Sequence, residues 1–260
     1  MSARVVPIAT NTFREAVRDR VLYNLVAFAI LMAGAAVLVG QISINMERLV
    51  VINLGLAAVS LFGVVIAIFI GIGLVSKEID KRTLYTVLSR PVRRWEFIVG
   101  KFLGLSGTLV VNSLCMAAGV YAALVYVSDH HHLLKTDSYV LVALYFIVLQ
   151  FVMVTALALL FSSFSSPLLS AVFAFCLFLI GSFSEDLRGF AAMSQGLARW
   201  ITTGIAYVIP NFSALNVISS VAHGEPVAGG LVLANTAYAL FYAGMALCGA
   251  VLIFERRNLK

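Results

Sequence analysis

Long apolar runs separated by short polar segments make up most of the chain. Six of these runs have the length of a helix that crosses a bilayer: 21–42, 50–75, 102–127, 139–161, 167–184 and 231–254. A hydrocarbon core of about 30 Å needs about 20 helical residues, whereas the strands of a β-barrel alternate in polarity over about ten residues. The pattern predicts an all-α integral membrane protein with six transmembrane helices in a single domain, 1–260.

The length of the first run and the first residue of the fifth run support this interpretation. The first run, from Val21 to Ile42, is longer than the core of a cleavable signal peptide, which has about 7–15 residues, so we expect it to remain as a membrane anchor. The fifth run is the shortest and begins at Pro167. Proline is favourable in the first turn of a helix, where its missing N–H costs little.

Composition agrees with a membrane protein. The chain is 62% apolar and 12% charged, whereas soluble domains are about 45–50% apolar and about 25% charged. A net charge of +6 would suggest nucleic acid as a partner of a soluble protein. Here the basic residues lie between apolar runs, without the exposed aromatic residues of single-strand binders, so we expect membrane lipids around the chain and no nucleic-acid partner.

The distribution of Lys and Arg predicts the orientation. With the N-terminus in the cytoplasm, fourteen of the eighteen basic residues fall in inside segments. The four that fall outside are Arg48, Lys135, Arg188 and Arg199. Because cytoplasmic loops carry an excess of basic residues, we expect both termini in the cytoplasm.

The uncharged stretch 200–221 is long enough for a seventh crossing. A seventh crossing would send Arg256, Arg257 and Lys260 to the outside and would place Pro210 in the middle of the membrane. Irregular backbone at that depth needs shielding by protein or by a wet cavity. We therefore expect the outer segment 185–230 to contain re-entrant or interfacial helices, bent at Pro210.

The N-terminal segment PIATNTFREAVRDR has the pattern of a short amphipathic helix on the inner membrane surface. Its apolar side chains are Ile8, Phe13 and Val17, and its basic side chains are Arg14, Arg18 and Arg20. Thr10 or Asn11 would cap its start. The alternative is a plain charged flank of the first transmembrane helix.

The apolar runs contain no residues that would form an ion-coupling or catalytic site. All thirty charged residues fall outside them, although ion-coupled carriers use ionisable groups at membrane depth. Gly100-Lys101 lacks the other residues of a phosphate loop, and the three cysteines, Cys115, Cys176 and Cys248, are expected to be packing residues. Three consecutive histidines, His130, His131 and His132, lie in an outer loop and are weak metal-ligand candidates. We therefore expect no catalytic site and no bound cofactor, and any driving energy must come from a partner.

The loop 76–101 concentrates the charge of the chain. Its segment KEIDKRTLYTVLSRPVRRWEFIVGK, 77–101, holds ten of the thirty charged residues, with a net charge of +4. Ile79, Leu84, Val87 and Leu88 recur among the charges at near-helical spacing, which is typical of a helix that enters a partner's groove. The alternative is a loop whose basic residues serve only to orient the protein.

This loop resembles that of the six-span permease subunits of the second class of ABC exporters. The matching residues are Glu78, Arg82-Thr83-Leu84, Pro91, Arg94 and Gly100-Lys101. The Ser-rich stretch 156–172 is similar to the break between the fourth and fifth spans of that family. The stretch 209–216 is similar to the outer segment before its last span.

The resemblance implies a coupling helix after span two and a set of partners. Two permease copies would pair, here as a homodimer, and two cytoplasmic ATPase subunits that bind ATP and magnesium would dock beneath them. The residues implied at the ATPase interface are Glu78, Arg82, Thr83, Leu84, Arg90, Pro91 and Arg94. The amphipathic N-terminal helix would assist through Phe13, Arg14, Val17 and Arg18. The implied setting is the inner membrane of a bacterium, and the implied function is export.

Two alternatives to solute export remain open at this stage. Some relatives transmit motion to an envelope partner in copper-site maturation, and a non-transport membrane anchor of a larger complex would have the same composition. The uncharged spans suit a lipid, a drug or a peptide equally, and pairing with a different permease remains possible.

Overall fold

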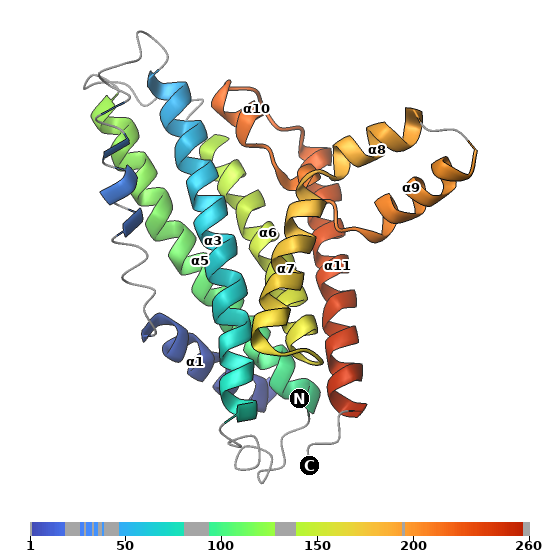
Figure 1. Cartoon of the computed structure of the whole chain (residues 1–260). Coiled ribbons are helices and arrows are strands. Elements are labelled where there is room, and N and C mark those ends of the chain that lie inside the picture. Colours follow the sequence, from blue (N-terminus) through green and yellow to red (C-terminus); the bar gives the residue numbers. More distant parts are fainter. Residues whose placement is uncertain are drawn as a thin grey trace.

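The computed structural model describes residues 2–18, 27–28, 30–32, 34–35, 38, 47–80, 94–127, 139–193 and 196–256. Every regular element in these ranges is a helix (Figure 1). The elements are α1 (Ser2–Arg18), α3 (Glu47–Asp80), α5 (Arg94–Val127), α6 (Tyr139–Ser162), α7 (Pro167–Ser182), α8 (Ser184–Met193), α9 (Leu197–Val208), the 3₁₀ turn η2 (Ser213–Leu215), α10 (Ile218–Ala222) and α11 (Gly229–Arg256). The prediction of an all-α membrane fold is confirmed.

Four of these helices, α3, α5, α6 and α11, are long and apolar enough to cross a membrane. Two bent pairs of helices are further candidates if each pair counts as one span. They are α7 with α8, bent by 56°, and 199–208 with 213–222, bent by 50°. The described residues therefore hold four to six candidate spans. The first apolar run, 21–42, lies largely outside the described residues, and its described positions between 27 and 38 are helical.

The helices form a bundle with two distinct ends (Figure 1). At one end lie α1, the last turn of α3, the first turn of α5 and the last turn of α11, and we call it the loop end. At the other end lie α8, α9 and α10, and we call it the hairpin end, after the antiparallel pair of α8 and α9 that projects sideways there. Helix α3 begins at the hairpin end, whereas α1 lies at the loop end.

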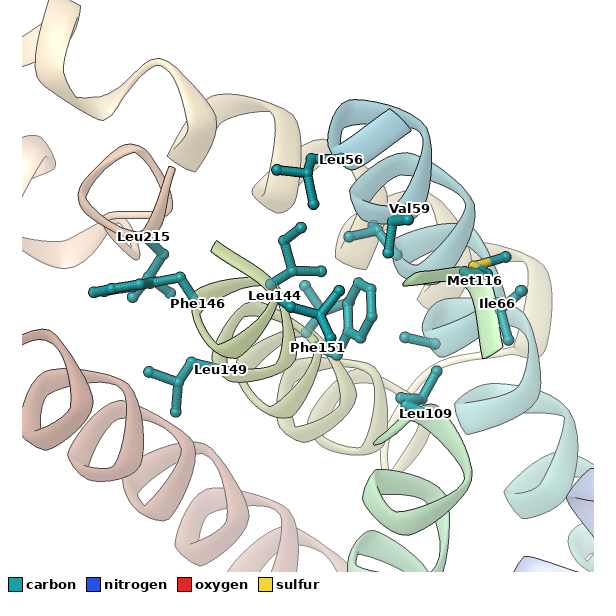
Figure 2. Packing of buried hydrophobic residues seen from close by; sticks show 14 of the residues in the cluster. Leu56, Val59, Ile66, Leu109, Met116, Leu144, Phe146, Leu149, Phe151 and Leu215 are labelled. Carbon is teal, nitrogen blue, oxygen red and sulfur yellow. The ribbon is translucent and has the colours of Figure 1, made fainter. Parts of the chain in front are cut away.

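Helix α6 is the centre of the bundle. It is apolar on all sides, and it packs against α3, α5, α7 and α11, as expected of a helix without a polar face. Figure 2 shows Phe151 of α6 between side chains of α3 and α5, among them Ile66 and Leu109. A Cβ at Gly63 of α3 would overlap the ring of Phe151, so a glycine is needed where this ring meets the α3 backbone.

Helix α7 buries only a narrow stripe. Pro167 occupies its first turn after Ser166, which confirms the expected start of the fifth run. The buried positions are Ser170, Ala174, Phe178 and Gly181. Most of the other apolar side chains of α7 are exposed, which suits a helix at the edge of the bundle that lipid or another chain covers.

The structure corrects the expected start of the N-terminal helix. Helix α1 begins at Ser2, so Thr10 and Asn11 lie inside it and cap nothing; the Thr10 hydroxyl instead donates to the Val6 carbonyl at 2.5 Å.

The candidate spans are longer than the apolar runs, which hold no charged residue. The four long spans therefore include charged residues: Arg48 in α3, Glu96 and Lys101 in α5, and Glu255 in α11.

The three cysteines are also placed differently from the expectation. Cys115, Cys176 and Cys248 are free thiols on the outer surfaces of their helices. They therefore contribute little to packing within this chain. Their apolar surroundings in sequence reflect a lipid-facing or partner-facing surface of the helix, which has the same composition as a core.

Candidate functional site

The charged loop is bounded by two long helices that meet at the loop end (Figure 1). Glu78 lies in the last turn of α3, which continues as a helix to Asp80, and Arg94 is the first residue of α5. The other residues implied at an ATPase interface lie outside the described residues: Arg82, Thr83, Leu84, Arg90 and Pro91. Both helices that the loop joins are 34 residues long, so any force on the loop acts directly on two helices that run the length of the bundle.

Helix α1 packs on the first half of α5 through two glycines. A Cβ at Gly100 would lie 2.7 Å from Ile8 Cγ2. A Cβ at Gly104 would lie 2.5 Å from the Ala9 carbonyl oxygen and 2.7 Å from Thr12 Cβ. Small residues at four-residue spacing let two helix backbones approach closely. The G-x-x-x-G of α5 is therefore the surface that receives α1.

The side chains of α1 differ in their exposure. Ile8, Phe13 and Val17 are half-buried, and Arg14 is exposed. The side chain of Arg18 lies outside the described residues. The most buried side chains of the helix are Thr12 and Ala16, at 2% and 0% exposed, and neither was singled out in the sequence. The glycine spacing in 100–104 was the available signal, since the side chains opposite two glycines must approach a backbone.

Two charged side chains are buried where α5 begins. Glu96 is 6% exposed and Lys101 is 2% exposed. The Lys101 ammonium lies 5.3 Å from the centroid of the Phe97 ring, within the range of a cation–π contact. Phe97 in turn stacks on Phe254 of α11, with centroids 6.0 Å apart. The start of α5 is thus held by α1 on one side and by α11 on another.

A cavity lined by polar groups lies between α3, α6, α7 and the segment that precedes α11. Its volume is about 190 Å³. The polar residues in its lining are Ser60, Gln150, Ser182, Ser213 and Asn216. Inside it the Ser60 hydroxyl donates to Gln150 Oε1 at 3.2 Å. The described residues that line this cavity include no charged side chain.

A larger and more open cavity adjoins the first one. It measures about 530 Å³ and shares Ala57, Asn216 and Ile218 with it. Along α3 the lining residues recur every three or four positions from Leu49 to Leu61, which places them on one face of that helix. The two cavities therefore form a continuous groove from the hairpin end toward the middle of the bundle.

The segment 209–216 is held by hydrogen bonds around Asn211. Asn211 Oδ1 accepts from the Ser184 hydroxyl at 2.5 Å, from the Ser213 hydroxyl at 2.7 Å and from the Ala214 N–H at 3.1 Å. The Asn211 N–H donates to the Tyr238 hydroxyl of α11 at 2.8 Å. Pro210 lies in the break between α9 and η2, and these bonds fix the bend that the sequence predicts there.

Metal binding receives no support from the described residues. Among them no group of three His, Cys, Asp or Glu side chains is close enough to hold an ion. His130, His131 and His132 lie outside the described residues, so the metal-ligand interpretation of that loop stays a prediction.

Comparison with known proteins then gives the family. Residues 6–259 match a family model described as "ABC-2 family transporter protein". No curated protein matches the chain. The apolar helices and this match together show a multi-pass membrane protein. Because the match spans nearly the whole sequence, the chain belongs to the ABC-2 family, whose members are the membrane permease components of ABC transporters.

Proposed function

We propose that this chain is the membrane subunit of an ATP-driven exporter and that separate cytoplasmic subunits hydrolyse the ATP. The observation that carries the proposal is the packing of α1 against α5 at Gly100 and Gly104, directly after the charged loop. A loop that only oriented the protein would not need a second helix packed against the start of α5. A loop that receives force from a partner needs such support, because the force must be passed to α5.

In this proposal the loop end faces the cytoplasm and the chain crosses the membrane six times. Helix α1 and the end of α11 lie at the same end of the bundle (Figure 1), which supports an even number of crossings. Helix α9 has 12 residues and is about 18 Å long, too short for a core of about 30 Å. Helices α8 to α10 then form a re-entrant or interfacial segment, and α1 lies along the inner surface.

The loop would act as the docking element for the ATPase. A helix within 77–93, together with exposed side chains such as Arg14 of α1, would sit in a cleft of the ATPase. Glu78 and Arg94 mark the two ends of this element, and their charges would set register and partner choice more than affinity. ATP and magnesium would be bound by the ATPase subunits, two of which would serve a pair of permease copies.

Long packed helices suit the transmission of that motion. Helices α3 and α5 each have 34 residues, about 51 Å at 1.5 Å per residue. They pack against each other and against α6, and packed interfaces switch between discrete arrangements rather than deforming continuously. A tilt imposed at the loop would therefore reach the groove along α3, where an uncharged, hydrogen-bonding cargo would be held or released.

A second candidate function is transmission of the motion to an envelope partner, with no solute moved. The feature that favours it is the projection of α8 and α9 from the bundle at the hairpin end (Figure 1). Both candidates share the ATPase and the loop. They differ in whether cargo binds in the groove along α3. A non-transport anchor would use neither the ATPase-docking loop nor this groove.

Charge reversal at the loop tests the ATPase interface. The chain is co-expressed with an ABC ATPase subunit that copurifies with the wild type, and Glu78→Arg and Arg94→Glu are purified by a tag on the permease. We expect each variant to reach the membrane and to retain much less ATPase than the wild type. Glu225→Arg and Arg188→Glu, which reverse charges at the hairpin end, serve as matched controls and should retain it fully. If a variant with both loop charges reversed retained as much ATPase as the wild type, the proposed interface would be wrong.

Reconstitution tests the requirement for a partner. Vesicles that contain the purified chain, with and without the ATPase, are compared for ATP-dependent accumulation of a panel of lipids, drugs and peptides. The proposal predicts no vectorial movement by the chain alone. Movement that needs only this chain would show that its energy source is internal, and the exporter-subunit proposal would then fail.

A further inference from the structure

The antiparallel hairpin of α8 and α9 exposes large apolar side chains. Met193, Trp200 and Tyr207 are 85%, 81% and 80% exposed. Phe190 and Ile201 are also more than half exposed. Helix α9 packs mainly against α8 and meets the bundle at its end, where the Tyr242 hydroxyl donates to the Val208 carbonyl at 3.2 Å. Aromatic and apolar side chains at such exposure are unfavourable in bulk water.

The same hairpin holds two arginines at one cleft. A cleft of about 300 Å³ lies between the two helices. It is lined by Arg188, Ala191 and Ala192 of α8 and by Arg199, Thr203, Ala206 and Tyr207 of α9. The three alanines leave room between the helices, and the arginines and hydroxyl groups supply hydrogen-bond donors around that room.

The acidic residues of the hairpin lie outside the lining of this cleft. Glu185 and Asp186 lie in the first turn of α8 and are not part of the lining. Within the described residues, neither Arg188 nor Arg199 forms an ion pair with a carboxylate. Both guanidinium groups are exposed, so they are available to an anion that enters from outside.

We propose that the hairpin lies in the headgroup region of the membrane and that its cleft binds the phosphate of a phospholipid. Guanidinium groups bind phosphate oxygens through paired hydrogen bonds, and the Thr203 and Tyr207 hydroxyls add donors. Trp and Tyr are favoured at the headgroup level. The apolar side chains around the cleft then enter the acyl boundary, as in other interfacial amphipathic helices.

The position of the hairpin agrees with this assignment. It projects sideways from the bundle (Figure 1), at the level where α7 ends and the candidate span of α11 begins. A hairpin there meets headgroups along its length. The site is independent of the ATPase, and it would anchor the hairpin end to the membrane while the loop end moves.

Retention of lipid by the purified full-length chain tests the cleft. Delipidated protein in detergent is mixed with phosphatidylglycerol or with a galactosyl diacylglycerol of equal chain length, and bound lipid is measured by native mass spectrometry. We expect phosphatidylglycerol to be retained in preference to the galactolipid. A basic residue near an anionic surface contributes about 1 kcal/mol, or roughly a fivefold change in binding, so Arg188→Gln and Arg199→Gln should each lower retention about fivefold.

Three further variants make the result specific. Arg188→Lys with Arg199→Lys keeps the charge and should retain more lipid than the double Gln variant. Glu225→Gln changes an exposed charge outside α8 and α9 and should leave retention unchanged. Retention of phosphatidylglycerol by the double Gln variant at the wild-type level would overturn the proposal. Equal retention of the galactolipid, or uptake of inorganic phosphate in place of the lipid, would overturn the assignment to a phospholipid.

The fluorescence of Trp200 tests the location of the hairpin. The chain has two tryptophans, so Trp95→Phe leaves Trp200 as the only emitter. In vesicles with brominated phospholipids we expect strong quenching of Trp200 and weak quenching by aqueous iodide. The opposite pattern would place the hairpin in water, and resistance to both quenchers would show that protein covers it; either result would overturn the proposal.

Discussion

Helix α1 and the hairpin of α8 and α9 are both amphipathic and both lie beside the main bundle, but they are held in opposite ways. Helix α1 lies flat against α5, with Thr12 and Ala16 almost fully buried. The hairpin packs chiefly on itself, and Trp200 remains 81% exposed. Helices α1 and α9 each have an apolar side and a more polar side, so amphipathic character alone does not decide which surface such a helix covers.

The difference comes from the surface that receives each helix. Helix α5 presents Gly100 and Gly104 to α1, and the two backbones approach until a single Cβ would clash. At Gly196 and Gly204 of the hairpin, an added Cβ would meet no atom of the described residues within 4 Å, so no described helix packs against these glycines. A groove of small residues lets a neighbouring helix pack closely against the protein. Where no such groove is present, the apolar face of an amphipathic helix can contact lipid instead.

The largest effect is expected from filling the α5 groove with Gly104→Leu. A side chain there meets the Ala9 backbone at 2.5 Å, and a backbone atom cannot move aside unless the whole helix shifts. We expect a loss of about 3 kcal/mol in stability, at the upper end for overpacking, and release of α1. Thermal unfolding in detergent and trypsin cleavage at Arg14 would measure both effects.

The control for this substitution is Gly73→Leu, near the end of α3. No atom of the described residues lies within 4 Å of a Cβ at that position, so the stability of the Gly73→Leu variant should stay close to that of the wild type. Equal trypsin sensitivity of the Gly104→Leu and Gly73→Leu variants would show that the glycine groove does not hold α1.

A smaller effect is expected at the hairpin end from Gly181→Ala. The new methyl group would contact the Pro210 carbonyl oxygen and would lie 2.6 Å from Phe212 Cδ2. It would push the segment 209–216 away from α7 at a cost of about 2 kcal/mol. Hydrogen exchange of the Phe212 N–H, which donates to the Gly181 carbonyl at 3.1 Å, should become faster. Gly244→Ala, with open space around its Cβ, is the control, and matching exchange rates in the two variants would contradict the prediction.

Asn211→Ala should cost about 1–2 kcal/mol in stability. It removes the acceptor of the Ser184 and Ser213 hydroxyls and of the Ala214 N–H, and buried donors without a partner are unfavourable. The loss would be measured by thermal unfolding in detergent. Asn216→Ala, at an exposed position, should have much less effect. If the two variants unfold at the same temperature, the Asn211 bonds do not determine the fold of the segment.

The smallest effect on stability is expected from Trp200→Ala. A side chain that is 81% exposed makes few contacts within the chain, so the change in detergent should stay within about 0.5 kcal/mol. Binding of the hairpin to vesicles should weaken more, because the indole is favoured at headgroups. Hydrogen exchange of α9 in detergent and in vesicles would separate the two effects. A large loss of stability in detergent would mean that Trp200 packs against protein.

Several elements follow from the sequence alone. The bounds of α6 and α7 fall within two residues of the apolar runs, and Pro167 and Pro210 mark a helix start and a bend as expected. These features are local: the length of an apolar run and the geometry of proline do not depend on distant residues. The family resemblance of the loop 76–101, with Glu78 and Arg94 at its two ends, was visible for the same reason.

Other features required the distant parts of the chain. The start of α1 at Ser2 was missed because Thr10 and Asn11 are residue types that often cap a helix. In the structure α1 packs on α5 and extends on both sides of these two residues. The thiols were assigned to packing because an outward-facing helix surface in a membrane is as apolar as a core. The burial of Lys101 against Phe97 was hidden because the run of charges before it suggested a solvated segment.

By itself the sequence determined that this protein is a helical membrane protein of the ABC-2 family, with its charge gathered in one loop. Those properties depend on hydrophobic length and on residue order, which are readable along the chain. Only the tertiary structure decided that α1 closes on Gly100 and Gly104, that Asn211 organises the bend, and that Arg188 and Arg199 share one cleft. Each of these brings together residues from different helices, and the packing of side chains in space selects such contacts.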